Sequence, residues 1–203
     1  MDNFSTHRPT TREGFAINID KTSGFDAGAG EALLDALFFE MMRHEAGCPH
    51  RAQHLTKVHA FARRIARAEG LDPRTTFVLE AAALAHDIGI RPALAKYGRD
   101  DGPYQEKEGA PLARALLTRL GFDEAAAERV AWLVGHHHTY AGIDGMDYQI
   151  LVEADFLVNW HENGADAARI AQGLGRIFRT PTGIALARTM FGLTDGAPGP
   201  DAP

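Results

Sequence analysis

Four residues of types that bind metal ions occupy positions where a helix would otherwise carry apolar side chains. They are His54, the adjacent pair His86 and Asp87, and Asp155. An unpaired carboxylate is costly in a low-dielectric interior, and no Lys or Arg shares the helical stripes of these two aspartates. The sequence therefore predicts that a divalent cation satisfies them. The mixed nitrogen and oxygen set suits Fe, Mn, Co, Zn, Ni or Mg.

A metal ion held by two imidazoles and two carboxylates keeps coordination positions open for water and substrate, which is typical of catalytic sites. Such an ion lowers the pKa of a bound water and polarises a phosphoryl oxygen. The set predicts hydrolysis through metal-activated water, with Asp87 binding metal and orienting the water. We expect one tightly bound ion.

Helices must bring these residues together. In the segment 54–70, His54 and Val58 begin a series of four-, three- and four-residue spacings that places them on one helical face. The segment 75–89 is apolar on almost every side, which predicts a buried central helix that ends at His86 and Asp87, with Gly89 as its cap. Asp155 takes an apolar position in a third helical segment, 147–163.

The remaining patterns complete an all-α domain, because no segment alternates as a strand would. The other predicted helices begin near Glu31 and cover 107–120, 124–138, about 166–178 and 183–191. The Gly- and Pro-bearing segment 90–103 is predicted to be a loop or lid. We expect a flexible N-terminal arm (1–29), one domain (30–193) and a flexible tail (194–203).

Three consecutive histidines, His136, His137 and His138, follow the stripe of the helix predicted over 124–138. His137 lies on that stripe and His138 continues it from Val134, so we favour these two as catalytic groups that bind phosphate or transfer a proton. A polar helix end is the alternative interpretation of the cluster.

Cations flank the first histidine. Arg51 and Lys57 lie three residues before and after His54, on the same helical face, and are predicted to bind a substrate phosphate. The planar fork of Arg51 makes it the stronger candidate, and ordinary surface charge is the alternative for both. Arg91 and Lys96 in the predicted loop are further candidate contacts.

The composition limits the classes of binding partner and the cellular compartment that we expect. Asp and Glu number 27 against 21 Lys and Arg, which leaves a net charge of −6 and no basic field for long nucleic acid. The single cysteine, Cys48, fits a reducing compartment. Because no apolar run has a membrane-spanning length and no signal-peptide pattern is present, we expect a cytoplasmic protein without a membrane partner. A homo-oligomer is compatible with the sequence.

Three segments in order resemble the HD-domain metal-dependent phosphohydrolases, over about Pro49 to Asn163. They are HRAQHLTKVHAFARRIA, AALAHDIG and QILVEADFLVN. The resemblance implies a compact helical bundle in which His54, His86, Asp87 and Asp155 bind the metal. It implies a small phosphate ester or nucleotide as the substrate.

The same resemblance leaves the second metal open. Family members with two metals carry a histidine between the His-Asp pair and the later histidines, and this chain has none between His86 and His136. Glu106 or Glu108 is a candidate oxygen ligand in its place. The sequence lacks the acidic pair typical of alarmone hydrolases and the Gly-Tyr-Pro element typical of cyclic dinucleotide hydrolases. An HD-type di-iron oxygenase and a non-catalytic metal-binding sensor module are the alternative functions.

Overall fold

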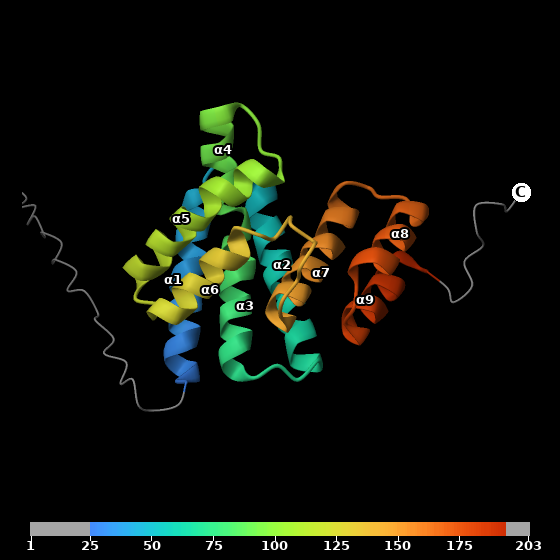
Figure 1. The fold of residues 1–203 in the computed structure, drawn as a ribbon, viewed down its shortest axis with the longest axis horizontal. Coiled ribbons are helices and arrows are strands. Elements are labelled where there is room, and N and C mark those ends of the chain that lie inside the picture. Colours follow the sequence, from blue (N-terminus) through green and yellow to red (C-terminus); the bar gives the residue numbers. More distant parts are fainter. Residues whose placement is uncertain (1–24, 194–203) are drawn as a thin grey trace, which may run out of the picture.

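The computed structural model of the chain describes residues 25–193, and these residues form helices and no strands (Figure 1). The helices are α1 (Ala27–His44), α2 (Pro49–Ala68), α3 (Pro73–Ala85), the short 3₁₀ helix η1 (His86–Gly89), α4 (Ile90–Tyr97), α5 (Gly102–Leu120), α6 (Glu124–Val134), α7 (Met146–Glu162), α8 (Ala167–Ile177) and α9 (Pro181–Phe191). The predicted all-α class is confirmed. The predicted tail, 194–203, and residues 1–24 of the predicted arm lie outside the described residues.

Helix α3 forms the centre of the bundle, as its apolar composition predicts. Every residue from Phe77 to Ala85 is buried, and α3 packs against α1, α2, α6 and α7. The Asp72 carboxylate caps the helix by accepting from the Thr75 backbone N–H at 2.9 Å, and Pro73 occupies the first turn, where its missing N–H costs nothing. This central position holds the end of α3, and with it His86 and Asp87, inside the protein.

Gly89 does not have the capping role predicted for it. Its φ is −77°, outside the left-handed region that a glycine cap uses. A Cβ at this position would lie 2.1 Å from the Gln105 carbonyl oxygen and 2.8 Å from the Gly109 backbone nitrogen. Gly89 is therefore required because η1 passes very close to the backbone of α5.

The segment 90–103, predicted to be a loop or lid, instead forms α4 and the start of α5. Pro92 and Pro103 each stand in the first turn of a helix, where an unpaired N–H is expected anyway. Gly98, with a φ of 68°, ends α4. The prediction was wrong because these proline and glycine residues mark helix ends and not an extended loop.

Two other helices begin earlier than their patterns predict, because polar caps lie upstream of the first periodic apolar residue. Helix α1 begins at Ala27, where the Asp26 carboxylate accepts from two backbone N–H groups. Helix α9 begins at Pro181, after the Thr180 cap. Neither difference changes the order of the elements.

Helices α8 and α9 form one end of the molecule, beyond α7 (Figure 1). An aromatic cluster attaches them: Trp160 of α7 stacks on Phe178 with ring centroids 5.1 Å apart, and Phe191 meets the edge of Trp160 at 5.9 Å. The buried Glu153 carboxylate of α7 accepts from the backbone N–H groups of Arg179 and Thr180 at 2.6 and 2.9 Å. None of the described helices is long and apolar enough to cross a membrane.

Candidate metal centre

The four predicted ligands meet in one buried cluster. His54 comes from α2, His86 and Asp87 from η1 and Asp155 from α7, and all four residues are at least nine-tenths buried. His54 Nε2 lies 3.2 Å from His86 Nε2 and 3.1 Å from Asp155 Oδ1. The Asp87 Oδ2 atom lies 3.6 and 3.5 Å from the same two imidazole nitrogens. The three helices therefore bring two nitrogens and two carboxylate oxygens together, as the apolar stripes predict.

The imidazoles of the cluster are oriented by hydrogen bonds on their outer nitrogens. His86 Nδ1 donates to the Ala83 carbonyl at 3.0 Å, and His54 Nδ1 is paired with Glu162 Oε2 at 2.8 Å. A carbonyl oxygen only accepts, so the proton of a neutral His86 stays on Nδ1 and the Nε2 lone pair faces the cluster. This is the arrangement that fixes the tautomer of metal-binding histidines.

A second group adjoins the first and shares Asp87 with it. Ligand atoms of Asp87, His137 and His138 all lie within 4.8 Å of one another, and so do those of His54, His86 and Asp87. Asp87 Oδ2 faces the first group, while Oδ1 lies 3.7 Å from His137 Nε2. His137 Nδ1 donates to the Val134 carbonyl at 2.8 Å. His137 Nε2 is buried without a hydrogen-bond partner among the described residues, so it is available to a metal ion or to a substrate.

The environment of the cluster shifts the pKa values of its members in different directions. Burial lowers the pKa of His54 and His86, but the carboxylates of Asp87 and Asp155 more than offset it and raise the pKa of His86 to about 9. Burial raises the pKa of Asp87 and Asp155, and the facing imidazoles reverse this effect, so both pKa values lie below the usual range. Both carboxylates are thus ionised near neutral pH, as a metal site requires. Burial and the nearby His137 lower the pKa of His138 to about 4.

Glu162 and Asn159 complete the surroundings of the cluster, and the sequence reasoning missed both. Asn159 Nδ2 donates to Asp155 Oδ1 at 2.8 Å, one helical turn further along α7. Glu162 lies seven residues beyond Asp155, on the same helical face. The spacing was thus available as a signal, but a glutamate near a helix end is usually solvated. In this fold it orients His54.

The cations predicted to bind phosphate are already paired with carboxylates of the protein. Arg51 Nε donates to Glu45 Oε2 at 2.6 Å, and Lys57 Nζ donates to Glu162 Oε1 at 2.5 Å. Arg91 donates to the Ala46 carbonyl at 2.6 Å. Burial lowers the pKa of Arg51, but the hydrogen bond and the charge of Glu45 more than offset this effect, so the pKa is raised. Asp87 is also close enough for its charge to contribute to the rise. Arg51 therefore lies beside the centre, held by Glu45.

The other candidates of the sequence lie further out. His136 donates from Nδ1 to the Trp132 carbonyl at 2.6 Å and stacks on the Trp132 ring. Glu106 accepts from the His138 backbone N–H at 2.9 Å, which fastens the loop that carries the histidines. Glu108 accepts from Tyr97 and from Lys96, at 2.6 and 2.9 Å. His136 and Glu108 are thus engaged by residues outside both groups, whereas Glu106 holds the backbone of His138.

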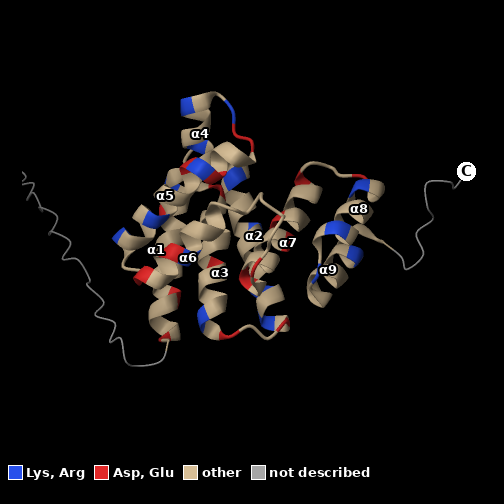
Figure 2. Ribbon diagram, in the orientation of Figure 1, with Lys and Arg blue, Asp and Glu red and all other residues tan. Residues whose placement is uncertain are grey.

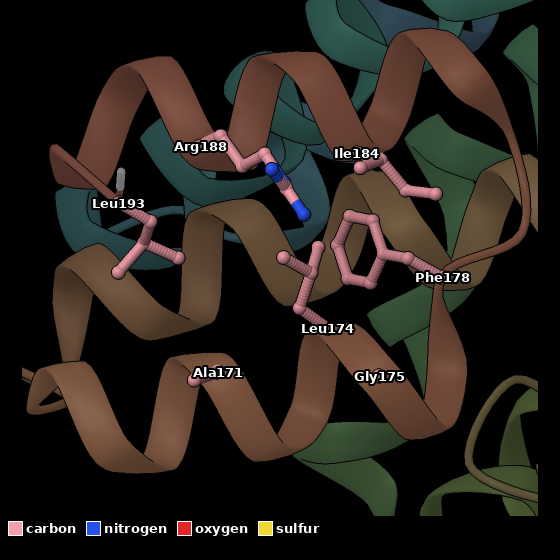
Figure 3. A pocket seen from close by; sticks show the side chains of 7 residues that line it. All are labelled: Ala171, Leu174, Gly175, Phe178, Ile184, Arg188 and Leu193. Carbon is pink, nitrogen blue, oxygen red and sulfur yellow. The ribbon is translucent and has the colours of Figure 1, made fainter. Parts of the chain in front are cut away.

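Two cavities bear on the question of a substrate. One of about 370 Å³ is lined by Asp155 and His138 and so opens directly beside the centre. Another, of about 420 Å³, lies between α8 and α9, where Leu174, Phe178 and Ile184 give it a mainly apolar lining (Figure 3). No candidate ligand of the metal centre lines the second cavity.

Comparisons with known proteins agree with this geometry. The family model of the HD domain matches residues 51–175. The chain is similar to a predicted HD superfamily hydrolase from an uncultured Thermotogales bacterium, known from its crystal structure. The two are 27% identical, with a TM-score of 0.55, and the match covers 80% of this chain and 84% of that one. No curated protein matches the chain significantly.

Proposed function

The chain belongs to the HD-domain family and is a metal-dependent hydrolase of the HD type, and we propose that its substrate is a small phosphate ester or nucleotide. One observation carries the proposal: two buried imidazoles present Nε2 to two ionised aspartates, and a hydrogen bond on Nδ1 orients each ring. This donor set suits a divalent ion with open coordination positions.

His54, His86, Asp87 and Asp155 would hold the tightly bound ion. When bound, such an ion supplies a polarised phosphoryl oxygen and a water of lowered pKa. Asp87 directs Oδ2 toward His86 and Oδ1 toward His137, so it would bind the ion and connect it to the second group of residues. The buried carboxylates stay ionised and offset the charge of the ion.

We assign His137 and His138 to the substrate. The His137 Nε2 atom is buried and unpaired in the described part of the chain, so it is available to bind a phosphate oxygen or to pass a proton to the leaving oxygen. His138, with a pKa of about 4, is neutral near pH 7 and acts there as a hydrogen-bonding group. Metal loss on substitution of either residue would instead make it a ligand of a second ion.

Arg51 is our candidate for a phosphate contact at the rim. A charge-assisted hydrogen bond contributes roughly 1.5–3 kcal/mol, so the Arg51→Ala variant should keep its metal while catalytic efficiency falls. Lys57 is the weaker candidate, because its ammonium group lacks the planar fork with which a guanidinium binds phosphate. Metal content measured beside kcat/KM separates a substrate contact from a metal ligand.

The direct test is anaerobic phosphate release from a panel of phosphorylated metabolites, measured together with metal content. We expect release by the metal-loaded protein and none after chelation. Oxygen consumption with about two irons per chain would indicate the di-iron oxygenase chemistry known from HD-type sites. Bound metal with no turnover of any substrate would indicate a sensor module.

A further inference from the structure

The cavity beside the metal centre extends away from it to the start of α8. Asp155 and His138 line one end, and Asn163, Ala165 and Arg169 belong to the α7–α8 connection and to the first turn of α8. The cavity is therefore bounded by the ligand cluster on one side and by a cation on the other.

Arg169 differs from the cations nearer the centre. Its backbone N–H is capped by Asp166 at 2.8 Å, but within residues 25–193 no carboxylate lies at ion-pair distance from its guanidinium. Arg51 and Lys57, by contrast, are held by Glu45 and Glu162. Helix α8 carries basic residues and no acidic ones, as its colouring in Figure 2 shows. Arg169 is thus placed to meet an anionic group that enters from outside.

Three aromatic side chains, Tyr140, Phe156 and Trp160, line the cavity together with the polar side chains of Asn159 and Asn163. The Tyr140 and Phe156 rings lie with centroids 5.3 Å apart, and Phe156 meets Trp160 at 5.4 Å. Burial raises the pKa of Tyr140 to about 12, so its hydroxyl is neutral and able to donate. Asn159 uses its amide N–H on Asp155, which leaves its side-chain oxygen as an acceptor. These groups suit a ring that carries polar substituents.

We propose that this cavity binds a substrate with a ring as its body and a second anionic group, and that Arg169 binds this group. That the other end of the substrate is a phosphate follows from the proposed function, whereas the role of Arg169 is inferred from the cavity alone. Arg169 is then a specificity-determining residue. It would leave the chemistry at the centre unchanged and select substrates by their far end.

The test uses non-hydrolysable probes, benzylphosphonate and its 3- and 4-carboxy derivatives, titrated calorimetrically into protein loaded with the ion found by metal analysis. We expect at least one carboxy derivative to bind about tenfold more tightly than benzylphosphonate, which is the low end for a charge-assisted hydrogen bond. Arg169→Ala should remove this preference, and Arg169→Lys should restore part of it. Arg176→Ala is the matched control, since Arg176 is an exposed arginine of the same helix that does not line the cavity.

The outcomes are distinct. Equal affinity for all three probes, a preference that survives in Arg169→Ala, or no binding of any probe would overturn the proposal. Arg169-dependent binding of the carboxy probes, without hydrolysis of the corresponding aryl phosphates, would support the proposal and contradict the phosphohydrolase function.

Discussion

The metal centre and the α8–α9 end of the molecule are built in different ways. The centre lies between α2, η1 and α7, its residues are buried, and polar partners orient the imidazoles of His54 and His86. Helix α8 buries only Ile170 among its residues, and the segment that follows it is attached through the stack of Phe178 on Trp160 and the hydrogen bonds to Glu153. Few buried contacts are typical of elements that open locally.

This difference indicates a division of roles. Residues that must hold an ion at fixed distances come from helices in the core, where packing and hydrogen bonds restrict them. The residue that we assign to substrate selection, Arg169, comes from the more loosely attached helix. Changes at the centre should therefore act on metal binding, and changes at α8–α9 should act on stability and substrate affinity.

The largest expected effect on the centre comes from Asp155→Ala. The substitution removes a buried ionised ligand, so we expect metal to be lost and activity to fall by more than about 100-fold. That factor is the upper limit expected when only a residue that hydrogen-bonds to a ligand is removed. Metal analysis and phosphate release check it, with circular dichroism to verify the helices. His161→Ala, an exposed change on the same helix, is the control. Full metal content in Asp155→Ala would mean that Asp155 is not a ligand.

A smaller effect on metal affinity is expected from Glu162→Gln. This substitution weakens the acceptor that orients His54 but leaves the imidazole in place. Loss of such an outer partner lowers metal affinity by about 10–100-fold. Competition with a chelator measures it. Because Glu162 also binds Lys57, the Lys57→Ala variant shows whether the ion pair matters instead. An equal loss of affinity in both variants would argue against orientation of His54.

Metal affinity should also depend on pH. The pKa of His86 is about 9 in the metal-free protein, so this imidazole is protonated near pH 7 and must lose its proton to bind an ion. Affinity should therefore fall as pH falls below 9, by about tenfold per unit for each proton released. Calorimetry at pH 7 in buffers of different ionisation enthalpy counts the protons. Binding without proton release would contradict the charge state we assign to His86.

The smallest expected effect on the centre comes from Phe178→Ala. This residue is 2% exposed and stacks on Trp160, so its removal should cost about 3 kcal/mol of stability, the low end for a buried aromatic side chain. Metal affinity should not change, because Phe178 contacts no ligand. Chemical denaturation and metal titration check the two parts, with Phe39→Ala, 58% exposed, as the control. A large loss of metal affinity would show that the two regions are coupled.

The sequence predicted that the four residues of the centre come together, because they interrupt strongly periodic helices. Asp155 stands between Leu151 and Val158 on a buried stripe of α7, where a carboxylate needs an explanation. Glu162 continues the same helical face but was not predicted. Its residue type and its position near a helix end do not distinguish a glutamate that orients a ligand from one that is solvated. Helix α4 was not predicted because Pro92 and Gly98 can mark either a loop or the ends of a helix.

The cavity beside the metal centre could not be predicted from the sequence. Its lining joins Tyr140, from the loop after the histidines, to Phe156 of α7 and to Arg169 of α8. These residues share no helical period, and only the packing of α8 against α7 brings them together. Periodicity predicts which residues enter the core, whereas the pairing of distant segments depends on tertiary contacts.

We expect the four-residue centre to bind a divalent ion on which phosphate release depends. The most direct test is a metal titration of the chelated protein in which bound ion and anaerobic phosphate release are followed together. Release should be absent at the start, rise in proportion to the ion bound and saturate once one ion per chain is in place. Undiminished release from the metal-free protein, or a filled site with no release from any phosphate ester, would contradict it.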